Sequence, residues 1–133
     1  YTKKIQLEAR VLGDLALNHI VPVARRYQSM LVDNVVKLRE LYGHGADDLT
    51  SDELRTIENI ARRVSAITRT VNEMVNERKK ANAISDQRSR AIAYHDTIAP
   101  ALNVIRRHAD KLELLIDNEM WPLPKYRELL FIR

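Results

Sequence analysis

The amino-acid sequence predicts an all-helical domain: an antiparallel bundle of three long helices, followed by a proline-rich aromatic tail. Only three glycines occur in 133 residues, and no useful window shows the alternation of apolar and polar residues that marks a strand. Apolar residues instead recur every three or four positions along three long stretches, as on one face of a helix. A chain of this length fits one domain, with helices at about 2–42, 50–83 and 86–118 and a tail at 119–133.

The first predicted helix carries apolar residues on one face until Gly43 and Gly45 end it. Lys3 and Lys4 would lie at the positive end of this helix, which the helix dipole disfavours, so we expect the helix to continue upstream in a longer parent chain. Because this helix is the longest, we expect its first turns, at residues 2–10, to extend beyond the bundle. The apolar face consists of Leu12, Ala16, Ile20, Val23, Tyr27, Leu31, Val35, Leu38 and Tyr42.

The second predicted helix begins with the pattern of a capping box, in which the Thr50 hydroxyl accepts from the amide of Glu53 and the Glu53 carboxylate reaches back. A heptad-like row of apolar residues follows and predicts nearly parallel packing against neighbouring helices. Arg78, Lys79 and Lys80 suit the negative end of this helix. The apolar row consists of Ile57, Ile60, Val64, Ile67, Val71 and Met74.

The third predicted helix follows the capping residues between Asn82 and Asp86 and ends near Asn118. Pro22 lies inside the first predicted helix and Pro100 inside the third, and each costs about 3 kcal/mol in a helix interior. Aligning the carboxyl ends of these two helices places both prolines near one height, where we expect the bundle to bend. The apolar row of the third helix consists of Ile84, Ala91, His95, Ile98, Leu102, Ile105, Ala109, Leu112 and Ile116.

The tail predicts a docking segment. It carries three of the seven aromatic residues of the chain, and its two prolines prevent a simple continuation of the preceding helix. We expect the tail to dock on another domain, with the start of the first helix as a second docking site; the alternative is that the tail folds back onto its own bundle. The candidate docking residues are Trp121, Pro122, Leu123, Pro124, Tyr126, Leu130 and Phe131 in the tail, and Ile5, Leu12 and Gly13 in the first helix.

The sequence predicts no catalytic residue, no cofactor-binding residue and no metal ligand. The stretch Gly43-His44-Gly45 lacks the lysine and the preceding strand of a phosphate-binding loop. His19 and His95 lie near the apolar rows, and His95 should diverge from its neighbour Asp96 on a helix. No two histidines are four residues apart, as a helical metal site would require.

The net charge of +4 and a pI near 9.5 raise nucleic-acid binding as an alternative function. Adjacent arginines such as Arg25-Arg26 point about 100° apart on a helix, so the basic residues cover several faces, and no aromatic stacking platform lies among them. Eighteen acidic residues dilute the charge, which argues against a nucleic-acid partner. Four acidic residues near the end of the third helix form either a surface for a basic partner or a solvated face: Asp110, Glu113, Asp117 and Glu119.

A third possible function is that of an autonomous helical interaction module, which would bind partners through an amphipathic groove. The sequence contains no run of about 18 apolar residues and no signal-peptide pattern, so we expect a cytoplasmic protein without a membrane partner. Cysteine is absent, which excludes disulfides, thiolate metal sites and cysteine nucleophiles.

Four separated stretches and the tail carry a family resemblance. The stretches are Ala9–Ala16, Asn18–Pro22, Ala93–Asp96 and Lys111–Leu115, whereas residues 43–54 show no family pattern. Together they resemble the C-terminal end of the type III glutamine synthetases. The resemblance implies one C-terminal helical domain at residues 1–133, with an accessory role in structure or assembly.

For the parent enzyme, the resemblance implies ATP-dependent formation of glutamine from glutamate and ammonia, with ATP and Mg²⁺ or Mn²⁺ as cofactors. The catalytic motifs of that family belong to a domain upstream of the part that this chain resembles, so no catalytic residue carries over to this segment. The implied partners are that upstream catalytic domain and the neighbouring subunits of a ring-shaped homo-oligomer.

Overall fold

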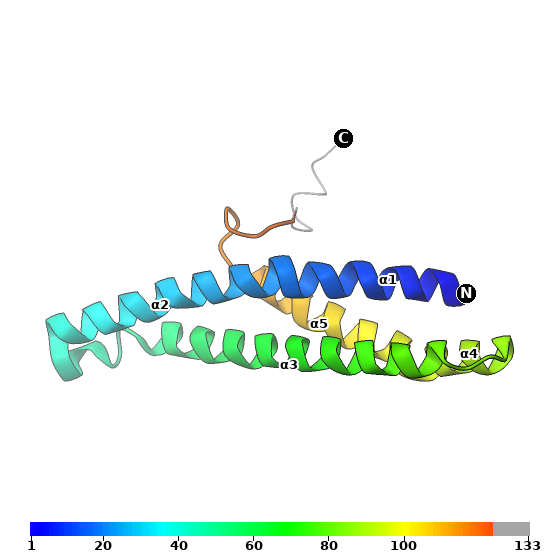
Figure 1. Ribbon diagram of the computed structural model, residues 1–133. Helices are drawn as coiled ribbons and strands as arrows, with labels where there is room; N and C mark the ends of the chain where they lie inside the picture. Colours follow the sequence, from blue (N-terminus) through cyan, green and yellow to red (C-terminus); the bar gives the residue numbers. More distant parts are fainter. Residues whose placement is uncertain (124–133) are drawn as a thin grey trace.

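A computed structural model describes residues 1–123, and these residues form three long helical stretches without a strand (Figure 1). The three stretches pack together, which confirms the all-helical bundle. The first stretch ends at the residue expected, and the third ends three residues before the expected one. The elements are α1 (Thr2–Leu15), the π-helical turn η1 (Ala16–Ile20), α2 (Val21–Tyr42), the 3₁₀ turn η2 (Gly43–Ala46), α3 (Ser51–Asn82), α4 (Gln87–Ala93), the π-helical turn η3 (Tyr94–Ile98) and α5 (Ala99–Leu115).

The turn between α2 and α3 depends on one glycine and on local hydrogen bonds. Gly43 ends α2 at a φ of 57°, in the region that favours glycine. The predicted capping box at the start of α3 is wrong: the Thr50 hydroxyl donates to the carbonyl of Ala46 at 2.8 Å, and Glu53 accepts from the Asn34 side chain at 2.8 and 2.9 Å. Glu53 therefore ties α3 to α2 instead of capping its own helix.

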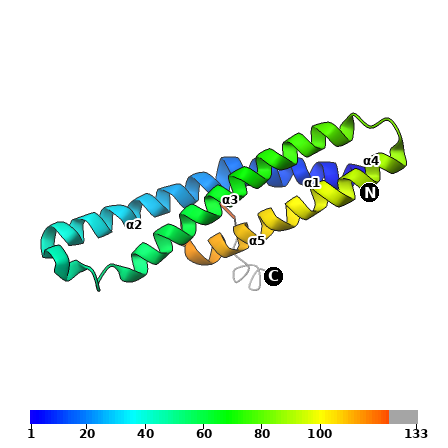
Figure 2. The same ribbon diagram turned by 90° about the horizontal axis from the view of Figure 1, so that it is seen from below.

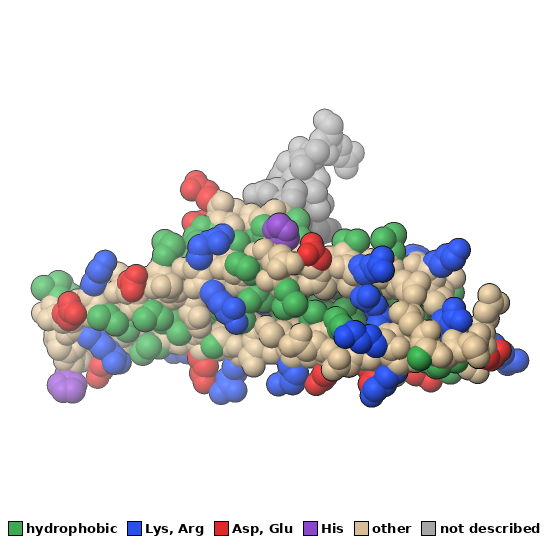
Figure 3. Space-filling model, viewed as in Figure 1, with side chains coloured by type: hydrophobic (Ala, Val, Ile, Leu, Met, Phe, Trp, Pro, Cys, Tyr) green, Lys and Arg blue, Asp and Glu red, His purple; other side chains and the backbone are tan. Residues whose placement is uncertain are grey.

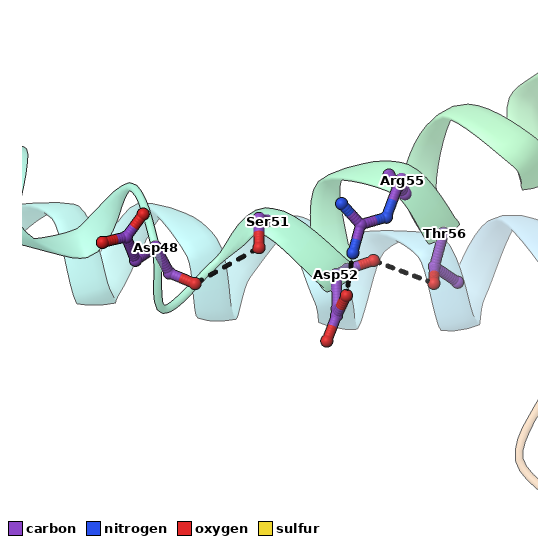
Figure 4. Close-up of polar contacts among 5 residues, drawn as sticks. All are labelled: Asp48, Ser51, Asp52, Arg55 and Thr56. Atoms are coloured by element: carbon purple, nitrogen blue, oxygen red, sulfur yellow. Dashed lines mark hydrogen bonds and ion pairs between the residues drawn. The ribbon is translucent and has the colours of Figure 1, made fainter.

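Other side chains support the first turns of α3 (Figure 4). The Ser51 hydroxyl donates to the carbonyl of Asp48 at 3.2 Å, and the Thr56 hydroxyl donates to the carbonyl of Asp52 at 3.1 Å. Arg55 pairs with the Asp52 carboxylate on the exposed surface. The helix dipole favours both ends of α3, because Asp52 and Glu53 lie in its first turn and Lys79 and Lys80 in its last turn.

Asp86 caps the start of α4, as the capping residues of this loop predicted. Its carboxylate accepts from the Ser89 hydroxyl at 2.6 Å and from the Ser89 backbone N–H at 2.9 Å. These two hydrogen bonds stabilise the ionised carboxylate and lower the pKa of Asp86. The chain is thus reversed within a short loop, and α4 begins beside the end of α3.

Each interior proline follows a π-helical turn. Val21 donates its N–H to the carbonyl of Ala16, and Ala99 donates to that of Tyr94, which are bonds across five residues. Pro22 and Pro100 come next, so the carbonyl four residues before each proline lies within the widened turn. A proline ring normally strikes this carbonyl in an α-helix. The wider turn provides a way to accommodate the ring without ending the helix.

The two prolines do not lie at one height, contrary to the prediction. The ring centroids of Tyr1 and His95 are 6.4 Å apart, and Glu8 pairs with Arg106 at 3.0 Å. A residue near the start of the chain therefore lies beside the residue whose number is larger by 94 to 98, since 95 − 1 is 94 and 106 − 8 is 98. In this register the prolines are separated by roughly 25 Å along the bundle. The prediction failed because it aligned the carboxyl ends of the two helices.

The expected overhang at residues 2–10 is also wrong, because the start of α1 packs within the bundle. Gln6 donates to the Asn82 side chain at 3.0 Å, and Ala9 is only 1% exposed. The surplus length lies at the opposite end, where α2 and α3 continue beyond the end of α5 (Figure 2). We call this region, residues 27–57, the two-helix arm.

The core of the closed part of the bundle is aliphatic with one buried tyrosine. Tyr94 is fully buried, whereas His95, which the sequence placed in the apolar row, is exposed. Both residues lie in the π-helical turn, where the wider spacing shifts which side chain faces inward. Trp121 joins the same core, with Ile20, Ile60, Ile67, Met74, Ile98, Leu102, Ile105 and Leu112 among its members.

We expect the substitution Gly13→Ala to stabilise the chain by about 0.5–1 kcal/mol, because glycine in a helix interior loses more entropy on folding than alanine. An added Cβ would lie 3.6 Å from Met74 Cε and 3.7 Å from Val71 Cγ1, which are ordinary contacts. Urea unfolding would measure the change. Gly43→Ala is the matched control and should destabilise, because its φ is positive; a loss of stability in Gly13→Ala would contradict the packing described for α1 and α3.

Candidate docking surface

The described part of the predicted tail lies against the bundle. Trp121 is 7% exposed and packs in the core cluster, whereas Pro122 and Leu123 are exposed. Asp117 shapes the turn that returns Trp121, since its carbonyl accepts from the N–H groups of Met120 and Trp121 at 3.1 Å each. This arrangement matches the fold-back alternative for Trp121. The other predicted tail residues, Pro124, Tyr126, Leu130 and Phe131, lie outside the described residues.

The candidate docking residues of the first helix make contacts inside the bundle. Ile5 and Leu12 are partly buried against the core cluster, and Gly13 is buried where α1 approaches α3. Trp121 belongs to the same core cluster. The structure therefore brings Trp121 of the tail together with Ile5 and Leu12 of the first helix at one apolar core, and docking on a further domain stays a prediction.

The indole N–H of Trp121 is buried and has no hydrogen-bond partner within residues 1–123. A buried donor left unpaired typically costs about 1–3 kcal/mol. Packing of the ring against the aliphatic core offsets this cost, because full burial of a large aromatic side chain contributes several kcal/mol.

The two-helix arm is an apolar surface that the sequence analysis missed. Seven of the thirteen exposed large hydrophobic residues of the described chain lie in residues 27–57. A third helix would cover part of this surface, but α5 packs along α1 and η1 and ends at Leu115. The shorter third predicted helix already implied that one end of the bundle would be left uncovered. The wrong register between the first and third helices placed that end at residues 2–10. The seven residues are Met30, Val32, Val36, Leu41, Tyr42, Leu49 and Leu54.

A groove between the helices of the arm adjoins this apolar surface. It encloses about 470 Å³ and is lined by Tyr27, Met30, Leu31, Asp33, Asn34, Lys37 and Glu53. Two contacts hold its walls together: the Asn34 amide donates to Glu53, and the Gln28 amide donates to the carbonyl of Ile57 at 3.0 Å. The arm is therefore a two-helix hairpin joined by side-chain contacts, with exposed apolar residues among the charged ones on its exterior.

The histidines form no metal site in residues 1–123, where no group of three potential ligands is found. His19 and His95 are exposed, which is one of the two outcomes expected for histidines beside the apolar rows, the other being packing. His95 Nδ1 lies 3.1 Å from the Asp96 carboxylate, so the prediction that these neighbours diverge is wrong. Both residues belong to the π-helical turn η3, whose spacing differs from that of an α-helix.

His108 lies in a basic environment between α3 and α5. The Arg63 guanidinium is 3.2 Å from His108 Nδ1, and Arg63 Nε donates to the Asn59 side chain at 2.8 Å. Partial burial, followed by the positive charges of Arg63, Arg107 and Arg69, lowers the pKa of His108. A neutral imidazole can accept the hydrogen bond from Arg63, so this contact favours the unprotonated histidine.

The acidic residues predicted at the end of the third helix are divided between the helix and the following turn. Asp110 and Glu113 lie in α5, whereas Asp117 and Glu119 follow it, because α5 ends at Leu115. Asp117 accepts from the backbone N–H of Glu119 at 3.3 Å. Asp117 thus helps to form the turn and does not oppose the helix dipole from within the last helical turn.

These features define a helical bundle domain that presents an apolar arm and a partly polar exterior to its surroundings. No helix within residues 1–123 combines the length and the apolar character needed to span a membrane.

Comparisons with known proteins give the family. A family model described as the glutamine synthetase C-terminal domain matches residues 1–39. A glutamine synthetase from Bacteroides fragilis (strain YCH46) is 48% identical over 134 residues, which cover 100% of this chain and 18% of that protein. A type-3 glutamine synthetase from Dictyostelium discoideum is 22% identical over 134 residues, again 100% of this chain and 18% of that protein.

The chain belongs to the glutamine synthetase C-terminal domain family. The resemblance to the type III enzymes found in the sequence is thereby confirmed. The chain spans 18% of the length of these relatives.

Because Trp121 is buried in the core of the bundle, we expect its indole ring to be shielded from solvent and from quenchers. This is the single tryptophan of the chain, so its emission should be blue-shifted and poorly quenched by acrylamide. We expect Trp121→Ala to lower the free energy of unfolding by about 3–5 kcal/mol. Leu123→Ala, at an exposed neighbouring position, is the control and should change stability little. Emission typical of a solvent-exposed indole would contradict the packing.

The lowered pKa of His108 predicts a pH dependence of stability. Between the folded pKa and the unfolded value near 6.5, the unfolded chain binds more protons at His108 than the folded chain does. The contribution is therefore fully present above about pH 6.5 and is lost as the pH falls through that range. We expect His108→Gln to flatten the decrease in unfolding free energy between about pH 7.5 and 5.5, as measured by urea unfolding at a series of pH values. Equal slopes in the variant and the unaltered chain would refute this role of His108.

Proposed function

We propose that this chain is an accessory C-terminal domain of a glutamine synthetase, inert in catalysis by itself and serving structure or assembly. One observation supports this proposal above the others: the whole chain aligns with a glutamine synthetase at 48% identity, yet it spans 18% of that protein. The greater part of the relative, including room for a catalytic domain, has no counterpart in these 133 residues.

The parent enzyme would catalyse the ATP-dependent formation of glutamine from glutamate and ammonia. ATP and Mg²⁺ or Mn²⁺ would bind in the rest of the parent chain, because none of the chemistry predicted for this segment provides ligands for them. The partners of the domain would be the upstream catalytic domain and neighbouring subunits of a ring-shaped homo-oligomer.

The shape of the molecule suits a bracing role. The first helical stretch runs without a break from Thr2 to Tyr42, which is about 60 Å at 1.5 Å per residue. Packing against α3 supports α2 and η1, and packing against α5 and η3 supports α1. The two-helix arm would carry the contact to a neighbouring domain, since more than half of the exposed large hydrophobic residues of the described chain lie in it and exposed apolar surface commonly marks an interface.

Nucleic-acid binding fits the structure less well. Several basic residues are paired with acidic ones on separate faces: Arg39 with Asp47 at 3.9 Å, Arg62 with Glu58 at 2.9 Å, and Arg106 with Glu8 at 3.0 Å. A surface that follows a phosphate backbone would keep its cations free along one stripe. A gel-retardation assay without binding at low salt would dismiss this alternative.

The proposal predicts that a change in the arm of the parent enzyme weakens assembly and leaves substrate binding intact. Leu41 is 71% exposed, so Leu41→Glu should not disturb the fold of the arm, but it would place a charge in the proposed interface. We expect loss of subunit association or a lowered melting temperature, with KM values for glutamate and ATP within about two-fold of the original.

Ser65→Glu is the matched control, because it adds the same charge at an exposed polar position of α3 outside the arm. Size-exclusion chromatography with light scattering would measure assembly in both variants. Unchanged assembly and melting in Leu41→Glu would remove the arm as the bracing contact. A large rise in KM without any loss of assembly would contradict the structural role and indicate a direct part in catalysis.

A further inference from the structure

One face of the two-helix arm continues the line of a hollow between α2 and α3. The hollow encloses about 640 Å³, and Arg25 of α2 and Ala61 of α3 are among the residues that line it. Val32 lies seven residues after Arg25, and Leu54 lies seven residues before Ala61. Because seven residues are close to two helical turns, Val32 and Leu54 share a face of the hairpin with Arg25 and Ala61.

The centre of this face is apolar and exposed. Val32, Val36 and Leu54 are 40%, 48% and 39% exposed. Val36 lies about one turn after Val32, and the hydrogen bond of 2.8 Å from Asn34 to Glu53 places Leu54 at the height of Val32. Valine forms helices less readily than lysine or glutamate, so two valines on an exposed helical face suggest that a partner covers them. In Figure 3, hydrophobic side chains lie on the arm, at the left, among basic and acidic ones.

Charged residues of opposite sign flank the two valines on α2. Arg25 lies seven residues before Val32 and Glu40 eight residues after it, which is about 10 and 12 Å along the helix. Arg25, Val32, Val36 and Glu40 fall within an arc of about 80° around the helix axis, at 100° per residue. Within residues 1–123, ion pairs are formed by the neighbouring Arg39 but by neither Arg25 nor Glu40. We call the surface formed by Arg25, Val32, Val36, Glu40 and Leu54 the valine face.

The wider distribution of charge along the hairpin has the same direction. Residues 40–52, at the far end of the arm, contain four acidic residues and no lysine or arginine. At the base of the arm, four arginines surround a single acidic residue, Glu58: Arg25, Arg26, Arg62 and Arg63. Residues 25–63 as a whole contain seven basic and seven acidic residues, so two such hairpins can approach each other without net repulsion.

We propose that the valine face pairs with the same face of a second copy of this chain, with the two hairpins antiparallel. A two-fold axis at Val32 sets Arg25 of each copy opposite Glu40 of the other, and the apolar side chains of both copies meet between these two ion pairs. Two hairpins packed in this way form a four-helix bundle. A parallel arrangement would instead set each charged residue against its own copy, which like charges disfavour.

This inference rests on the proposed role of the arm as an interface and names the partner of one of its faces. The valine face is separate from the groove of the arm, whose lining residues include neither Val32 nor Val36. Leu41, nine residues after Val32, points about 180° away from it on the helix. A contact at Leu41 and pairing through the valine face can therefore be tested one at a time.

Self-association of the 133-residue chain tests the pairing, because this chain has its own aliphatic core. Sedimentation equilibrium at about 100 μM should show monomers and dimers, since a small apolar centre with two ion pairs suits a micromolar affinity. We expect Val36→Glu to weaken dimerisation about ten-fold or more. Leu41→Glu is the matched control: it adds the same charge at an exposed apolar position of α2 and should leave the dimer constant within about two-fold.

Charge exchange tests the antiparallel order. Arg25→Glu and Glu40→Arg should each weaken dimerisation about ten-fold, because each turns two attractive pairs into two repulsive ones. The chain with both substitutions, and an equimolar mixture of the two single variants, should dimerise within about three-fold of the unaltered chain, because opposite charges again face each other. Arg26→Glu is the control, since this exposed neighbour points about 100° away from Arg25.

Circular dichroism would verify the folding of every variant. A chain that stays monomeric at this concentration, or a mixture of the two single variants that does not recover, would overturn the proposal. Dimerisation that appears only after removal of residues 124–133 would also overturn it and assign the valine face to that segment. If Leu41→Glu weakens assembly of the parent enzyme while the 133-residue chain does not dimerise, the proposed function stands and only this inference fails.

Discussion

The register between the three helical stretches is the constraint on which the rest of the structure depends. The Asn82 side chain at the end of α3 accepts from the Tyr94 hydroxyl and from the Gln6 amide, so one residue joins all three stretches. Because Tyr94 is fully buried, sliding α3 by one turn against the third stretch would leave the Tyr94 hydroxyl buried and unpaired, at a cost of about 1–3 kcal/mol. With the starts of α1 and α4 fixed at one end, the shorter third stretch must leave the two-helix arm uncovered at the other.

The two π-helical turns explain how such long helices contain prolines. In each stretch the turn lies directly before the proline and ends on a buried isoleucine, Ile20 or Ile98. The wider turn rotates the following residues relative to the preceding ones, so the apolar face changes direction while the helix continues. After this change α1 packs against α5 and η3 and approaches α3 at Gly13, whereas α2 packs chiefly against α3. In the first stretch, the π-helical turn and its proline therefore mark the place where the three-helix bundle gives way to the two-helix arm.

The spacing of apolar residues was sufficient to predict the helices, because a repeat of three or four residues follows from the local geometry of a helix alone. It was insufficient wherever the geometry is not that of an α-helix: the row placed His95 inward, but the π-helical turn buries Tyr94. The register between the first and third stretches could not be read from either stretch alone, since it depends on contacts such as Glu8 with Arg106. The same error placed the overhang at residues 2–10 and concealed the apolar arm. Trp121 was identified from composition, but which surface it packs against is a tertiary property.

Association through the arm would depend on apolar burial, which salt weakens little. The Gln28 amide donates to the carbonyl of Ile57, and the Asn34 amide donates to Glu53, so two side-chain contacts join α2 to α3 within the arm. A partner of the arm would therefore meet two helices whose relative position is already set, and binding would not have to order them.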